Sequence, residues 1–99
     1  MTAPGSFPPH GVRFRRAPEV LWRAAGFGVV VLGPADPEPR TLTGTGPALW
    51  EALDTAMSAD DLAEELAARF GVEPARVAAD ISPVLAELHR IGALDEESG

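Results

Sequence analysis

The stretch at residues 41–53, TLTGTGPALWEAL, constrains the fold most strongly. A short segment with β propensity leads through a Gly-Thr-Gly turn into a segment that opens with Pro47. Glycine permits a sharp backbone turn, and proline suits the first helical turn, where its missing N–H costs nothing. The stretch therefore predicts a strand that passes directly into a helix. The apolar residues of that helix are Leu49, Trp50 and Leu53.

Two more strands are expected before this one, at residues 19–24 and 27–32. The second contains the β-branched run 29–31, which is typical of a strand covered on both faces. The loop at 33–39 holds three prolines, and the third strand follows at 40–43. Because the connections are too short for crossover helices, we predict an antiparallel meander with the short third strand at its edge.

Three helices are expected to follow, at residues 47–55, 58–70 and 73–91. Ser58 is a typical N-cap, and Gly71 fits the position that ends a helix. The apolar residues Leu62, Leu66 and Phe70 form a stripe on the second helix, and Pro83 should kink the third. The prediction is an α+β fold, a winged helix-turn-helix-like unit with a three-stranded antiparallel sheet followed by three helices.

The two ends have a different composition from the middle. Residues 1–17 are rich in proline and glycine and are expected to form a flexible N-terminal tail, with one domain at 18–95 and a disordered acidic tail at 96–99. Arginines alternate with apolar residues at 12–16. A short strand and a basic patch that touches a partner are therefore alternatives for this part of the tail.

Composition and charge exclude several classes of function. The 99 residues include no cysteine, which excludes disulfides and thiolate sites, and no run is long and apolar enough to span a membrane. No secretory signal is evident, so we expect a cytoplasmic protein with no membrane partner. Residues 51–99 carry three arginines against twelve acidic residues. Nucleic-acid binders need a basic surface, so this acidic helical half argues against a nucleic-acid partner.

Catalytic and cofactor chemistry finds little support. The turn at residues 43–46 lacks the lysine and the glycine spacing of a phosphate-binding loop. His10 and His89 form no metal-binding spacing, and the abundant carboxylates are expected on solvated helix faces. We therefore expect no enzyme activity, no metal and no cofactor.

Four segments in this order resemble the PqqD family, whose members are also described as RiPP recognition elements. RiPPs are ribosomally synthesised and post-translationally modified peptides. The segments are the apolar strand at 29–32, the strand-to-helix piece at 42–53, the acidic helix at 61–70 and the last helix with its end at 77–94. The resemblance covers residues 18–94, with departures at Thr43, Gly44 and Pro83.

The resemblance implies a non-catalytic peptide chaperone of natural product biosynthesis. In this family the leader of a precursor peptide adds as a strand to the sheet edge, in the groove beside the third helix, and is presented to a modifying enzyme. Such strand addition uses backbone hydrogen bonds for affinity and side-chain pockets for specificity. Carried onto this chain, the edge is Arg40, Thr41, Leu42 and Thr43, and the helix wall is Arg76, Val77, Asp80, Ile81 and Val84.

Simpler interpretations of these residues remain open. The apolar members Val77, Ile81 and Val84 could be core residues, and Arg76 and Asp80 could pair along the helix. Arg40 could protect the edge strand from aggregation. A winged-helix DNA-binding regulator, and a docking scaffold that no longer binds peptide, are the alternative functions. A second copy of the chain could also cap the edge strand as a homodimer.

Overall fold

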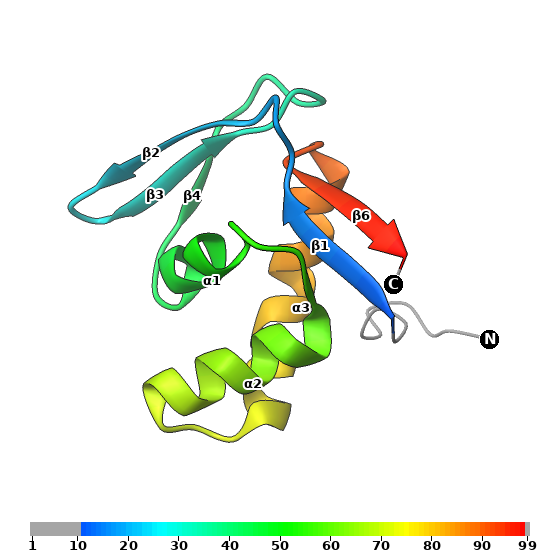
Figure 1. The fold of residues 1–99 in the computed structure, drawn as a ribbon. Helices are drawn as coiled ribbons and strands as arrows, with labels where there is room; N and C mark the ends of the chain where they lie inside the picture. Colours follow the sequence, from blue (N-terminus) through cyan, green and yellow to red (C-terminus); the bar gives the residue numbers. More distant parts are fainter. Residues whose placement is uncertain (1–10, 99) are drawn as a thin grey trace.

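The computed structural model describes residues 11–98, which form six strands and three helices (Figure 1). In chain order these elements are β1 (Val12–Arg16), β2 (Leu21–Ala25), β3 (Gly28–Leu32), β4 (Arg40–Leu42), α1 (Gly46–Ala52), β5 (Met57–Ser58), α2 (Ala59–Phe70), α3 (Pro74–Arg90) and β6 (Leu94–Ser98). The α+β class with antiparallel strands and three helices is confirmed.

The predicted meander is the sheet β2-β3-β4, in which both pairs are antiparallel. Val31 pairs with Arg40 and Val29 pairs with Leu42, which fixes the register of the edge strand. Side chains alternate across the sheet, since Val29, Val31 and Leu42 are buried while Thr41 is exposed. The predicted strand boundaries are correct to within two residues.

A second sheet, β5-β1-β6, was not predicted. The expectation of a flexible tail is wrong for Val12–Arg16, and the alternative of a short strand is correct there, because this segment pairs with Leu94–Ser98 along its whole length. Phe14 is only 4% exposed and anchors this strand in the core, while Arg15 contacts Glu97 of β6 at 3.3 Å. The acidic segment expected to be disordered from residue 96 is likewise part of β6 through Ser98. The expectations for residues 1–10, including His10, lie outside the described residues.

Local sequence signals set the helix ends. The Ser58 hydroxyl accepts a hydrogen bond from the Asp61 N–H at 3.1 Å, and Gly71 ends α2 with φ of 68°. α3 is seventeen residues long in all, and Pro83 lies inside it without ending it. Phe70, expected on the apolar stripe of α2, is instead 46% exposed. It is the last residue of α2, next to the turn at Gly71.

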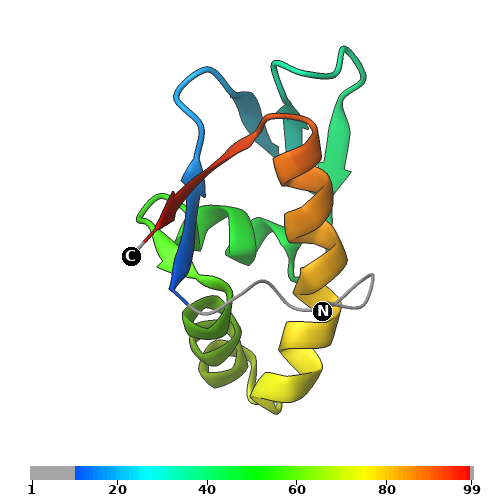
Figure 2. The ribbon, with the colours of Figure 1, turned by 90° about the vertical axis from the view of Figure 1, so that its right-hand side faces the viewer.

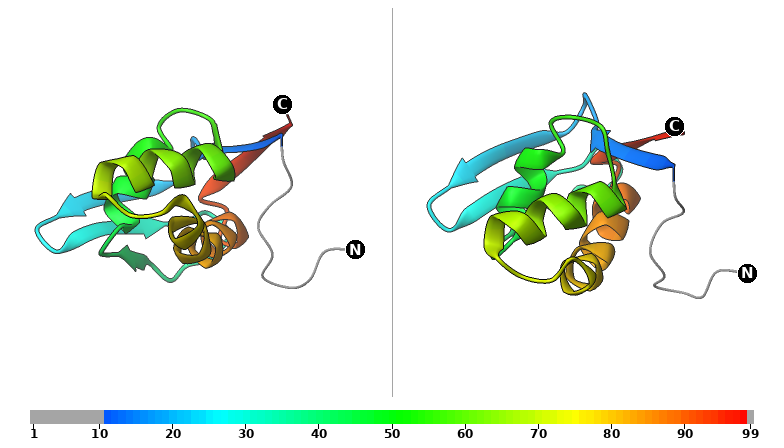
Figure 3. Two further views of the ribbon diagram at one scale, coloured as in Figure 1. Left: turned by 90° about the horizontal axis from the view of Figure 1, so that it is seen from below. Right: turned by 60° about the horizontal axis from the view of Figure 1, so that its bottom comes forward.

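The core lies between the three helices and the inner faces of both sheets. Its largest fully buried side chains are Trp50, Leu49, Leu53, Leu62, Leu66, Ile81, Leu85, Leu88, Ile91 and Val31. Figure 2 shows β1 beside β6 on one side of the molecule and β4 beside the C-terminal half of α3. In Figure 3 the turn end of the β2–β3 hairpin extends past the helices, whereas the other end of the sheet lies against them.

Candidate functional site

The edge strand β4 offers its backbone on one side. Its only strand partner in the described part of the chain is β3, so the opposite side of Arg40–Leu42 is unpaired by any strand there. Thr41 and Thr43 are exposed, whereas Leu42 is 8% exposed on the inner face. Both threonines therefore lie on the face of the sheet opposite Leu42. An unpaired edge of this kind is where an extended peptide can add as a strand.

α3 runs beside this edge in the opposite direction, as Figure 2 shows. The two elements touch where the Arg40 Nε donates a hydrogen bond to Glu87 Oε2 at 2.8 Å. Three strand residues advance the chain about 10 Å, which equals the rise of about seven helical residues. Counting back from Glu87, the level of Thr43 falls near Asp80.

One face of α3 is turned toward β4. Arg76, Asp80, Pro83 and Glu87 follow one another at spacings of four, three and four residues, which places them on one helix face. Because Glu87 contacts Arg40, this face is the one beside the edge strand. We call these four residues the α3 stripe. Arg76, Asp80 and Pro83 are exposed, and Glu87 is half-buried.

The structure separates the five helix residues expected in the site. Val77 and Ile81 are 3% and 1% exposed and belong to the core, so a peptide at the surface cannot reach their side chains. Val84 is half-buried and packs at the border of the core. Arg76 and Asp80 are exposed, and neither makes an ion pair within residues 11–98, so the alternative of a pair between them is wrong for this structure.

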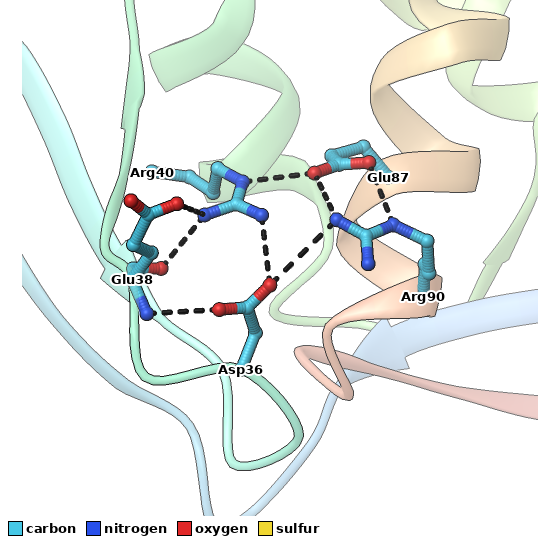
Figure 4. Close-up of polar contacts among 5 residues, drawn as sticks. All are labelled: Asp36, Glu38, Arg40, Glu87 and Arg90. Carbon is cyan, nitrogen blue, oxygen red and sulfur yellow. Dashed lines mark hydrogen bonds and ion pairs between the residues drawn. The ribbon is translucent and has the colours of Figure 1, made fainter.

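A network of five charged residues fastens β4 and the preceding loop to the end of α3 (Figure 4). Arg40 bonds Glu87, reaches Asp36 at 3.0 Å and donates to the Glu38 carbonyl at 2.8 Å. Arg90 bonds Glu87 at 2.7 Å and approaches Asp36 at 3.7 Å. Of these five residues, only Arg40 is among those predicted from the sequence to form the site. The spacing of Glu87 and Arg90 was a local signal for one pair, but no pattern in the sequence joined either residue to Asp36.

The electrostatics of this network keep it ionised. Hydrogen bonds from Arg90 and then Arg40 lower the pKa of Glu87 from its usual 4.5 to about 2. The Glu38 N–H and the Arg40 guanidinium lower the pKa of Asp36, and the bond to Glu87 raises the pKa of Arg40. Arg40 therefore has internal carboxylate partners, and its side chain bridges β4 and α3 at one end of the strand.

Two kinds of feature are absent from the described residues. Within residues 11–98, no group of three or more His, Cys, Asp or Glu side chains is arranged to hold a metal ion. His89 instead contacts Glu96 of β6 at 3.0 Å. None of the helices in the described part of the chain is long and apolar enough to cross a membrane.

Comparison with known proteins gives one family and one solved structure. The family model for coenzyme PQQ synthesis protein D (PqqD) matches residues 28–94, which is more than half of the chain. Among solved structures, the chain resembles the PqqD truncation of Methylobacterium extorquens PqqCD, determined by solution NMR and described as a functional, stand-alone RiPP recognition element. The TM-score is 0.71 at 26% identity, and the match covers 93% of this chain and 97% of the other. The search of curated proteins gave no match. The chain belongs to the PqqD family.

Proposed function

We propose that this protein is a non-catalytic adaptor that binds the leader region of a ribosomal precursor peptide and presents it to a modifying enzyme. The observation that carries the proposal is the unpaired edge of β4 beside the exposed α3 stripe. Membership of the PqqD family and the likeness to a structure described as a functional RiPP recognition element support it.

The leader would bind as an antiparallel strand along residues 40–43. The backbone of these residues would supply hydrogen bonds, so the burial of the Leu42 side chain does not prevent its main chain from taking part. Thr41 and Thr43 would flank the leader on the outer face of the sheet. Sequence-independent bonds of this kind give affinity, and selectivity has to come from side chains on α3.

Three residues of α3 are suited to that selection. Arg76 is an exposed cation and Asp80 an exposed anion one helical turn later, so they would pair with an acidic residue and with a basic or hydroxyl residue of the leader. Val84 would supply apolar contact at the border of the core. Val77 and Ile81 would support this wall from behind, since both are buried.

Titration with synthetic leader peptides tests the proposal. The peptides come from short precursors encoded beside the gene, and the readout is the backbone amide signals of the ¹⁵N-labelled chain. The largest shifts are expected at residues 40–43, with further shifts at Arg76 and Asp80. Shifts that cluster on α2 instead, or no binding by any leader, would overturn the assignment.

A charge reversal supplies the matched variant. Arg76→Glu is expected to weaken binding of an acidic leader, because it replaces attraction by repulsion at the wall of the site. Arg69→Glu makes the same change on α2, where the arginine is exposed and approaches Glu51 at 3.4 Å, and is expected to leave affinity unchanged. Equal effects of the two variants would point to net charge and remove Arg76 from the site.

A further inference from the structure

The β2–β3 hairpin presents a second open edge, on the side of the sheet opposite β4. β2 pairs with β3 alone among the described strands. Leu21 and Phe27 are each 65% exposed and Trp22 is 46% exposed, so three large apolar side chains of the hairpin and its turn face solvent. Residues 20–32 contain a single charged residue, Arg23. An open edge with this composition lacks most of the features that protect natural edges from pairing.

A cavity lies under the same hairpin, between its inner face and α1, on the side where the hairpin overhangs α1 in Figure 1. Its volume is about 520 Å³. We call it the hairpin pocket. The aromatic and proline residues that line it are Trp22, Phe27, Pro47 and Trp50. A space of this size is large enough for bulky apolar side chains of a ligand.

The walls of the hairpin pocket are held in place before any ligand arrives. The rings of Trp22 and Trp50 meet edge-on with centroids 6.0 Å apart. The Arg16 guanidinium lies 4.9 Å from the Trp22 ring and 5.5 Å from the Trp50 ring, and Asp54 holds it at 2.7 Å. A ligand therefore meets a preformed aromatic surface and loses little affinity to ordering it.

The register of the sheet determines which side chains of an added strand would face the hairpin pocket and which would face outward. Trp22 pairs with Val31 and Ala24 with Val29, and both valines are buried, so these β2 residues face the pocket side. Arg23 pairs with Val30 and points to the outer face. A strand added along β2 keeps this alternation. Its side chains beside Trp22 and Ala24 would enter the hairpin pocket, and the one between them would lie opposite Arg23.

We propose that the β2 edge and the hairpin pocket bind an extended segment of a partner protein in which an acidic residue stands between two large apolar residues. Charge complementarity selects this occupant: Arg23 is exposed and makes no ion pair within residues 11–98. A second copy of the chain fits poorly. A two-fold pairing that uses all five residues of β2 sets Arg23 opposite its copy, and like charges directly opposite each other are destabilising.

This site is separate from the one proposed for the leader. β3 lies between β2 and β4, so the two open edges face in opposite directions across the sheet. The protein could therefore hold two extended segments at once, one on each edge.

Two synthetic peptides test the inference directly. Each is a blocked heptapeptide, Thr-Thr-Phe-Glu-Phe-Thr-Thr or the same sequence with Lys in place of Glu, titrated into the ¹⁵N-labelled full chain. The Glu peptide is expected to shift the amides of Leu21–Ala25 and the indole N–H signals of Trp22 and Trp50. The Lys peptide should bind about two- to fivefold more weakly, the range of a cross-strand charge pair.

Variants of the chain sharpen the result. Arg23→Glu is expected to reverse the preference, so that the Lys peptide binds more tightly. The matched control Arg13→Glu changes an exposed arginine on β1, in the other sheet, and should leave the original preference intact. The inference is overturned if neither peptide binds at millimolar concentration, if both bind unmodified protein equally, or if the shifts fall on β4.

The two proposals can fail separately. Leader peptides are scored by shifts at β4 and by Arg76→Glu, whereas the heptapeptides are scored by shifts at β2 and by Arg23→Glu. A protein that binds no leader but discriminates between the heptapeptides retains the β2 site, and the reverse outcome retains only the β4 site.

Discussion

Replacing Gly33 with alanine tests whether the loop before β4 depends on close contact with the end of α3. A Cβ at this position would overlap the carbonyl oxygen of Ile91 and lie 2.7 Å from Ile91 Cγ1. Ile91 is fully buried, so it has no open space into which to move. The loop itself must shift by roughly 1 Å to relieve the overlap. That loop carries Asp36 and leads into Arg40, so the shift would propagate to the charged network and the edge strand.

The cost follows from the contacts that such a shift breaks. The Ala35 N–H donates to the Ile91 carbonyl at 2.9 Å, and a displacement of about 1 Å would exceed the range of a hydrogen bond. Losing that bond costs about 0.5–1.5 kcal/mol, and overpacking costs about 1–3 kcal/mol. The reduced backbone freedom of the unfolded alanine variant returns about 0.4–1 kcal/mol. The free energy of unfolding should therefore fall by about 0.5–4 kcal/mol.

Thermal unfolding followed by circular dichroism measures this effect. For a domain of this size the melting temperature should drop by at least about 2 °C. Gly26→Ala is the matched control, because a Cβ at Gly26 meets no atom within 4 Å and should change stability by less than about 1 kcal/mol. The reasoning is refuted if both variants melt together with the unmodified protein. A large loss in Gly33→Ala with unchanged Arg40 side-chain NMR signals would refute only the link to β4.

Three shorter predictions concern the network, the aromatic residues and the α3 stripe. The pKa of Glu87 is about 2 instead of its usual 4.5, so its ion pairs stabilise the fold fully above pH 4.5, and this contribution is lost as pH falls toward 2. In the Glu87→Gln variant, the free energy of unfolding should therefore depend less on pH across that window, as measured by urea titrations at successive pH values. Trp50→Ala should cost about 3–5 kcal/mol in the free energy of unfolding, and Trp22→Ala clearly less, because Trp50 is 1% exposed and Trp22 46%. Asp80→Lys should shift leader preference toward acidic sequences in fluorescence titrations while changing stability by no more than about 0.5 kcal/mol, since Asp80 is exposed.

Local patterns predicted the parts of the fold that depend on neighbours in sequence. Ser58 and Gly71 marked the ends of α2 because capping uses residues within one turn. The meander was predictable because its loops are short. The sheet β5-β1-β6 depends on pairing between opposite ends of the chain, such as Arg15 with Asp95, and neither segment signals the other locally.

The candidate site divides in the same way. Once residues 40–43 are predicted as a strand, alternation of side chains is enough to put Thr41 and Thr43 on the outer face, where the structure has them exposed. The burial of Val77 and Ile81 does not follow from the sequence alone, since an apolar residue on an amphipathic helix fits both the core and a groove wall. The partners of Arg40 could not be found from the sequence, because Glu87 lies 47 residues away and meets it only through the arrangement of β4 against α3.

That arrangement also limits how a leader could lie if it binds as proposed. The Arg40–Glu87 contact joins β4 to α3 at one end, with side chains only partly exposed to solvent. Leader side chains that point toward α3 would then have to lie past the Arg40–Glu87 contact, at the level of Thr43 and Asp80, where the α3 stripe is exposed. Breaking the contact with Arg40→Ala should lengthen the accessible edge and relax selection, because side chains that now meet the Arg40 guanidinium would be admitted. A leader that binds Arg40→Ala with unchanged affinity and unchanged sequence preference would show that the network anchors the loop and does not bound the site.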